Sequence, residues 1–147
     1  MQLQVFTQPS TEQLEWIHQR LVEFNAAHFE VKQRPALAVM VEDKQGQPQG
    51  GISAKTFGRW LMIDYLWLHP DLRGQGWGEQ MLSALEQQAI QRGCQMAWVD
   101  TLAFQALGFY QKQGYQVDTV LEDYPLTGKR YYLRKVLQPD SLHCEPL

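Results

Sequence analysis

The central stretch of the chain, a nearly continuous apolar segment at residues 60–68, constrains the fold more than any other feature. Such a run is typical of a strand that is buried on both faces of a sheet. Pro70 ends the run, and a glycine-rich turn follows it. Apolar residues then recur at helical spacing, namely Met81, Leu82, Leu85, Ala89 and Ile90. Gly93 stands where a left-handed C-terminal cap is expected. The pattern therefore predicts a strand–turn–helix unit in the middle of the chain.

The segments on either side predict a mixed α/β fold around this unit. Ser10 and Gln13 have the spacing of a capping box, which favours a helix that begins near Thr11. A further helix is expected over residues 104–113, and a short one between residues 24 and 35. Strands are expected at residues 2–6, 36–41, 51–57, 96–100, 115–121 and 130–137. This order gives an antiparallel N-terminal half and a βαβ crossover in the middle.

Length and charge limit the class of protein. The chain has 147 residues, which fits one domain at residues 1–137 followed by a tail at residues 138–147. Asp and Glu total 16 against 13 Lys and Arg, and the resulting net charge of −3 argues against a nucleic-acid-binding protein.

The positions of the cysteines, histidines and apolar residues argue against further classes of protein. Cys94 and Cys144 are the two cysteines and the four histidines are scattered, so we expect neither a disulfide framework nor a metal site. The N-terminal residues lack the basic stretch followed by an apolar core that is typical of a signal peptide. The sequence also has no apolar run of the ~20 residues that cross a bilayer. We therefore expect a cytoplasmic protein without a membrane partner.

The turn after the apolar segment has the chemistry of an anion site. It consists of Arg73, Gly74, Gln75, Gly76, Trp77 and Gly78. A helix start offers about four backbone N–H groups without internal partners, and the helix dipole adds positive charge there. Glycines let a phosphate group approach the backbone closely. The spacing matches neither the dinucleotide fingerprint nor the P-loop. The alternative is a tight turn that only connects two elements.

Two motifs give the chain a resemblance to a known family. The pattern Arg73-x-x-Gly76-x-Gly78 resembles the acyl-CoA-binding motif of the GNAT superfamily of N-acyltransferases. Residues 106–115, with Tyr110 at their centre, are similar to the second signature of that superfamily. The resemblance covers roughly residues 1–137. It implies a mixed, mostly antiparallel sheet with a central splayed parallel pair and flanking helices. Ala103 departs from the pattern, because many members carry Asn there, and Gln105 is a candidate replacement.

The resemblance also implies a donor site for acetyl-CoA as co-substrate, without a metal. Backbone N–H groups of residues 73–78 are expected to hold the pyrophosphate of CoA. The backbone of Leu66, Trp67 and Leu68 is expected to pair with the pantetheine arm. The alternation of apolar residues shifts phase between Ile63 and Leu66, which indicates a β-bulge. The N–H of Leu66 or of its neighbour is therefore a candidate to polarise the thioester carbonyl.

Four side chains are candidates for the chemistry. Tyr110 matches the family residue that protonates or hydrogen-bonds the leaving thiolate, although an aromatic on a buried helix face is the alternative. Asp64 is the acid in the central strand and a candidate general base, and a structural role near the bulge is equally open. Glu122 and Asp123 can hold a cationic acceptor, with a solvated loop as the alternative.

The expected function is transfer of an acetyl group from acetyl-CoA to a primary amine, by direct attack in a ternary complex. The acceptor is a small-molecule or peptide amine. A non-catalytic acyl-CoA-binding module on the same fold and a nucleotide-phosphate-binding protein are the alternatives. The family commonly forms dimers, so a homodimer is also open to this chain.

Overall fold

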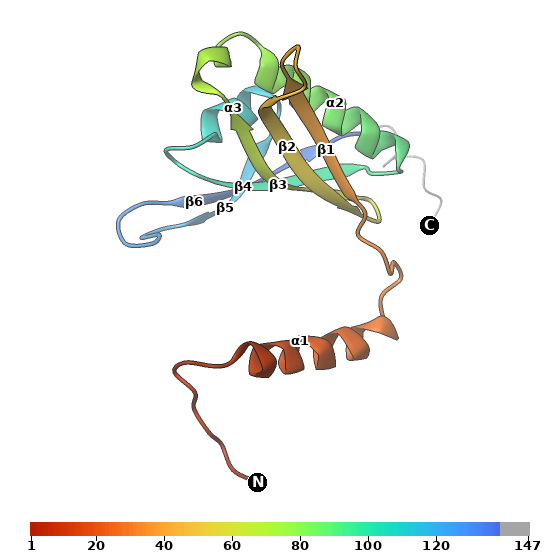
Figure 1. The fold of residues 1–147 in the computed structure, drawn as a ribbon, viewed down its shortest axis with the longest axis vertical. Helices are drawn as coiled ribbons and strands as arrows, with labels where there is room; N and C mark the ends of the chain where they lie inside the picture. The colour runs from red at the N-terminus through yellow and green to blue at the C-terminus, as the bar shows by residue number, and fades with distance from the viewer. Residues whose placement is uncertain (139–147) are drawn as a thin grey trace. The chain divides into compact units, whose positions relative to one another are not determined.

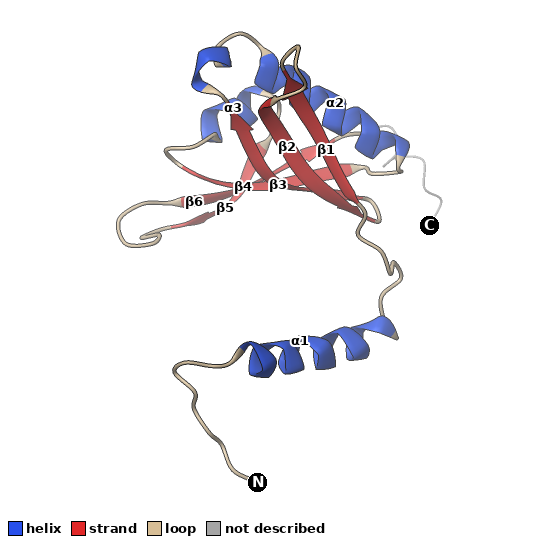
Figure 2. Cartoon of the chain, viewed as in Figure 1, coloured by secondary structure: helices blue, strands red, loops and turns tan. Residues whose placement is uncertain are grey.

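The computed structural model describes residues 1–138, and the chain falls into two compact units, residues 1–32 and the part that begins at residue 33 (Figures 1 and 2). The first unit contains helix α1 (Thr11–Ala26). The Ser10 side chain accepts a hydrogen bond from the Gln13 backbone N–H (3.1 Å), and the Gln13 side chain accepts one from the Ser10 N–H (2.9 Å). This confirms the predicted capping box.

Two predictions for the first unit are wrong. Residues 2–6 form no strand, although their apolar residues alternate. Alternation does not make a strand without a neighbour to take its backbone hydrogen bonds, and these residues pair with no strand among the described residues. The short helix expected between residues 24 and 35 is also absent. The chain turns at His28 and Phe29, whose N–H groups both donate to the carbonyl of Asn25.

The second unit is built on a six-stranded sheet with the order β1-β2-β3-β4-β6-β5. The strands are β1 (Ala36–Glu42), β2 (Pro48–Phe57), β3 (Trp60–Leu68), β4 (Met96–Leu102), β5 (Gln116–Leu121) and β6 (Arg130–Val136). The helical elements are the 3-10 turn η1 (Pro70–Leu72), α2 (Trp77–Gln91) and α3 (Leu107–Lys112). Strands β3 and β4 are parallel, and the other neighbours are antiparallel. The predicted mixed α/β fold with a central parallel pair is confirmed.

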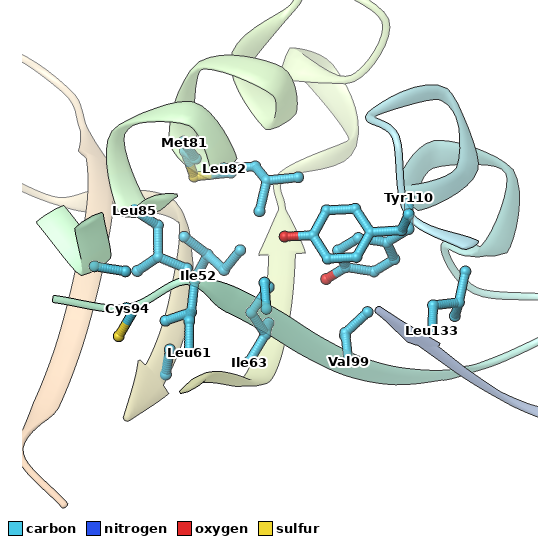
Figure 3. Close-up of a cluster of buried hydrophobic side chains, with 14 residues drawn as sticks. Ile52, Leu61, Ile63, Met81, Leu82, Leu85, Cys94, Val99, Tyr110 and Leu133 are labelled. Carbon is cyan, nitrogen blue, oxygen red and sulfur yellow. The ribbon is translucent and has the colours of Figure 1, made fainter. Parts of the chain in front are cut away.

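The core lies between α2 and one face of the sheet (Figure 3). Leu61 and Ile63 of β3 pack there with Leu82 and Leu85 of α2, and none of these side chains is more than 4% exposed. The expectation that β3 is buried on both faces is wrong, because Asp64 and Tyr65 are exposed. The second face of β3 instead carries Asp64 together with Met62 and three aromatic side chains, those of Trp60, Tyr65 and Trp67.

Both glycine-terminated helices end as expected, but α3 begins later than predicted. Gly93 follows α2 with φ +94°, the left-handed conformation that the sequence indicated. Helix α3 starts at Leu107 rather than at residue 104. Residues 103–106 form a turn, which the Gln105 side chain closes by accepting from the N–H of Leu102 (3.0 Å). The turn therefore takes the place of the first helical residues.

Candidate active site

The candidate site lies where β3 and β4 separate. Their parallel pairing covers only Trp60–Met62 against Met96–Trp98, and each strand continues beyond it, to Leu68 and to Leu102. A cleft of about 940 Å³ opens between the separated ends. The splayed parallel pair that the resemblance implied is therefore present.

A bulge in β3 shapes one wall of this cleft. In the β2–β3 pair, Tyr65 lies opposite Ser53 and Ile63 lies opposite Ala54, so Asp64 is an extra residue. The predicted phase shift between Ile63 and Leu66 is confirmed. Because of the bulge, Ile63 and Leu66 both face the core side of the sheet, where Leu66 lies opposite the buried Ile52.

The backbone of β3 presents polar groups to the cleft. The N–H of His69 donates to the carbonyl of Gln49 on the β2 side (2.8 Å). Residues of an antiparallel strand alternate in pointing their backbone groups toward that neighbour and away from it. The backbone groups of Leu66 and Leu68 therefore point away from β2, toward the cleft. The Leu68 carbonyl accepts from Arg73 Nε (2.9 Å), which agrees with this direction.

The glycine-rich turn forms one end of the cleft. Gly76 caps α2 with φ +88°, a left-handed conformation that a side chain would strain. A Cβ atom on Gly78 would lie 3.2 Å from Cε1 of Phe109, so this glycine lets α3 pack close to the start of α2. Of the turn residues predicted to bind the donor, Arg73, Gly74, Gly76 and Gly78 line the cleft, whereas Gln75 and Trp77 do not.

Tyr110 is the candidate acid that the fold brings to the cleft. Its side chain comes from α3 and is only 2% exposed (Figure 3). Its ring lies against those of Phe109 and Tyr115. Tyr110 nevertheless lines the cleft. Burial first, and then the charge of Asp100, raise the pKa of its phenol above the usual value. The hydroxyl therefore stays protonated at neutral pH and can donate a hydrogen bond.

The cleft is lined from both faces of the sheet. Leu66, Val99 and Thr101 belong to the core face, together with Tyr110. The other side is lined by residues whose side chains lie on the second face of the sheet, namely Asp64, Tyr65, Asp100 and Arg130. A molecule that enters from the glycine-rich turn and one that enters from the second face can thus meet between the strands.

Sequence reasoning missed a polar cluster on the second face. Arg130 donates to Oδ1 of Asp100 from Nε (3.1 Å) and from Nη2 (2.7 Å), and its Nη1 donates to the Tyr124 hydroxyl (3.0 Å). All three residues line the cleft. A usable signal was the position of Asp100, directly after the buried Val99 near the carboxyl end of a parallel strand, where ligands of α/β folds bind.

Of the three acids predicted as site residues, only one lines the cleft. Asp64 lines the cleft and forms an ion pair with Lys55, with Oδ1 3.0 Å from Nζ. Glu122 lies 3.5 Å from Lys129. Neither Glu122 nor Asp123 lines the cleft, although their neighbour Tyr124 does. Their proposed contact with an acceptor stays a prediction.

The described residues hold neither a metal-binding cluster nor a membrane-spanning helix. Residues 1–138 contain no cluster of three or more His, Cys, Asp or Glu side chains that could hold a metal ion. In the same part of the chain, no helix is long and apolar enough to cross a membrane.

Comparison with known proteins identifies the family. The model of the acetyltransferase (GNAT) family matches residues 3–115. Blasticidin-S acetyltransferase of Streptomyces morookaense is 36% identical over 83 residues, which are 56% of this chain and 61% of that protein. The chain thus spans about three fifths of this relative.

Two further proteins match over more of their length. Acetyltransferase Atu2258 of Agrobacterium fabrum is 30% identical over 67% of this chain and 72% of that protein. A crystal structure of an acetyltransferase from Bacillus cereus superimposes with a TM-score of 0.82 at 26% identity, over 90% of this chain and 97% of that one. The chain belongs to the GNAT family of acetyltransferases.

Proposed function

We propose that this protein transfers an acetyl group from acetyl-CoA to a primary amine of a small-molecule or peptide acceptor. The observation that carries the proposal is the cleft itself. It joins a glycine-rich helix start, a strand edge with backbone groups directed into the space, and the Tyr110 side chain. Membership of the GNAT family supports acetyl-CoA as the donor, since the family's first motif is an acyl-CoA site.

The donor site in this proposal uses backbone groups. The pyrophosphate of CoA binds to N–H groups of residues 73–78, at the start of α2, where the helix dipole favours negative charge. The amide-bearing pantetheine arm runs along β3 and pairs with the backbone of Leu66–Leu68. Arg73 supports this arrangement by tying the turn to the Leu68 carbonyl. The guanidinium therefore positions the turn as well as adding positive charge.

The reaction proceeds by direct attack. The free amine of the acceptor attacks the thioester carbonyl, and the Leu66 N–H stabilises the oxyanion that develops. The C–S bond then breaks and releases the CoA thiolate. Asp64 accepts the proton that the attacking nitrogen loses. One of its carboxylate oxygens is held by Lys55, so the acid keeps a fixed orientation at the bulge.

Tyr110 assists the departure of the thiolate. Its raised pKa makes it a weaker acid than an ordinary phenol, so complete proton transfer to a free thiolate of pKa ~8.5 is uphill. The hydroxyl therefore acts while the C–S bond is breaking, by donating a hydrogen bond to the developing charge. The released thiolate takes one proton from solvent, and Asp64 returns the proton of the amine to solvent, so the reaction balances.

Release of CoA thiol from acetyl-CoA tests the proposal. Butylamine, 1,4-diaminobutane and glycinamide represent a monoamine, a diamine and a peptide-like amine. We expect amine-dependent thiol release, an acetylated amine in the product mixture, and binding of CoA in preference to ATP and NAD. Binding of CoA without transfer to any of the three amines would favour a non-catalytic acyl-CoA-binding module. Preference for ATP or NAD would favour the nucleotide-binding alternative.

A small-molecule acceptor receives support from one relative. The Streptomyces protein is named as an acetyltransferase of blasticidin S, which is a small molecule and not a protein. We therefore expect small amines to be better acceptors than glycinamide in the same assay.

A further inference from the structure

We propose that Asp100 is the carboxylate that binds the amine of the acceptor, and that Arg130 and Tyr124 are positioning residues that hold Asp100 in place. The proposal rests on the proposed acetyl transfer and assigns the acceptor end of its cleft. The roles proposed above for the residues of the donor site stay as they are.

The hydrogen bonds of Asp100 leave one oxygen for a ligand. Both donors of Arg130 bind the same atom, Oδ1, at 3.1 Å and 2.7 Å. Within residues 1–138, no donor reaches Oδ2. A carboxylate accepts through both oxygens, so Oδ2 keeps its full capacity for the N–H groups of an amine. Hydrogen bonds to a charged acceptor are among the stronger ones in proteins.

Arg130 is itself held in a fixed position. Its guanidinium donates to the Tyr124 hydroxyl and lies 5.4 Å from the centre of the Tyr124 ring and 5.3 Å from that of Tyr132. Tyr132 lies directly opposite Asp100 in the β4–β6 pair, which runs side by side in Figure 1. The strand pairing and the two rings therefore fix the direction in which Asp100 presents Oδ2.

The location of Asp100 suits the acceptor rather than the donor. It lies on the second face of the sheet, opposite the face that carries Tyr110 and the core. The side chains of Asp100 and Tyr110 line the same cleft, and the negative charge of Asp100 contributes to the raised pKa of the Tyr110 phenol. An amine bound to Asp100 thus enters the cleft from the second face of the sheet, opposite the face that carries Tyr110. This direction leaves the glycine-rich end of the cleft to CoA.

The other acids near the cleft are less suited to this role. Asp64 is the proposed base and must release the amine after taking its proton. Glu79 lies in the first turn of α2, next to the expected pyrophosphate site. Asp100 therefore provides a hydrogen-bond acceptor for the amine that is separate from the proton transfer and from the phosphate.

Steady-state kinetics of Asp100→Asn test the assignment, with the best amine from butylamine, 1,4-diaminobutane and glycinamide. The amide keeps the side-chain shape and an oxygen for Arg130 but removes the negative charge. We expect KM for the amine to rise about tenfold or more, KM for acetyl-CoA to stay constant, and kcat to change less than about threefold. Asp118→Asn is the matched control, because Asp118 pairs with Arg134 outside the cleft.

Arg130→Lys tests the positioning role. The single variant should raise KM for the amine, and the double variant with Asp100→Asn should be no worse than Asp100→Asn alone, because Arg130 acts through Asp100. Additive effects would overturn the positioning role. An unchanged KM for the amine in Asp100→Asn would overturn the acceptor site while leaving acetyl transfer intact. Absence of transfer by the unaltered protein would instead reject the proposed function, and the acceptor site with it.

Discussion

Lys55 and Asp64 form an ion pair across the β2–β3 pair, with Nζ 3.0 Å from Oδ1, at the one bulge of that pair. Lys55 lies opposite Met62, and the extra residue at the bulge brings Asp64 within reach of it. The same irregularity turns the backbone of Leu66 toward the cleft. The proposed base and the proposed oxyanion donor therefore depend on a single feature of β3.

Asp64→Asn should lower kcat with little effect on the affinity for CoA. Loss of a general base typically costs about 10²–10⁴-fold in rate. Because the free amine is the reactive species, activity should recover in part at higher pH, where more of the acceptor is deprotonated. Initial rates between pH 7 and pH 10, with Asp118→Asn as the control, measure this. An Asp64→Asn profile parallel to that of the unaltered protein would assign Asp64 a structural role.

Tyr110→Phe should lower kcat by about 10²-fold and leave CoA affinity nearly unchanged. The phenyl ring keeps the packing against Phe109 and Tyr115, so the fold should hold. Since burial raises the pKa of Tyr110, its deprotonation should not limit the rate below pH 10. Calorimetric titration with CoA and single-turnover rates separate binding from chemistry. A kcat equal to that of the unaltered protein would make Tyr110 a core aromatic only.

The bulge and the glycine-rich turn were predictable because their signals are local. The phase shift between Ile63 and Leu66 lies within one strand, and the positive φ of Gly76 lies within one turn. Each signal spans a few residues, so no knowledge of strand pairing is needed. The same holds for the capping box at Ser10.

The acceptor end of the cleft was not predictable for the opposite reason. Asp100 and Arg130 are 30 residues apart and meet through the β4–β6 register, which sequence pattern alone does not specify. The same limit explains the strand wrongly predicted at residues 2–6. Its alternation is as regular as that of a true strand, but no neighbouring strand pairs with it among the described residues. Tertiary pairing, rather than propensity, decided both cases.

Gly76→Ala should destabilise the protein and weaken CoA binding together. A left-handed conformation costs a residue with a Cβ atom roughly 1–2 kcal/mol, and Gly76 has φ +88°. The control is Gly108→Ala, because Gly108 lies inside α3 with open space around its Cβ position. That change should be neutral or slightly stabilising, since alanine favours a helix. Thermal unfolding with and without CoA measures both effects, and equal behaviour of the two variants would contradict the prediction.

A buried hydrogen bond between Tyr115 and Glu86 gives the last prediction. The Tyr115 hydroxyl donates to Oε2 of Glu86 (2.8 Å), and Lys135 Nζ lies 3.1 Å from Oε1. Burial, followed by the Glu86 charge, raises the pKa of Tyr115 above its usual value. The folded state therefore keeps a proton that the unfolded chain loses above pH ~10. The stability from this phenol is complete below that pH and is lost as the pH rises further.

The free energy of unfolding should therefore fall above pH 10, by about 1.4 kcal/mol per pH unit for each such tyrosine. Tyr115→Phe should be less stable at neutral pH, because Glu86 loses a partner, but its stability should decline less steeply with pH. Tyr110 keeps its own contribution in that variant, so a reduced slope rather than a flat one is expected. Urea titrations between pH 9 and pH 11 measure the slope, with Tyr65→Phe as the control because the Tyr65 side chain is 79% exposed. A slope that Tyr115→Phe leaves unchanged would show that Tyr115 ionises equally in both states.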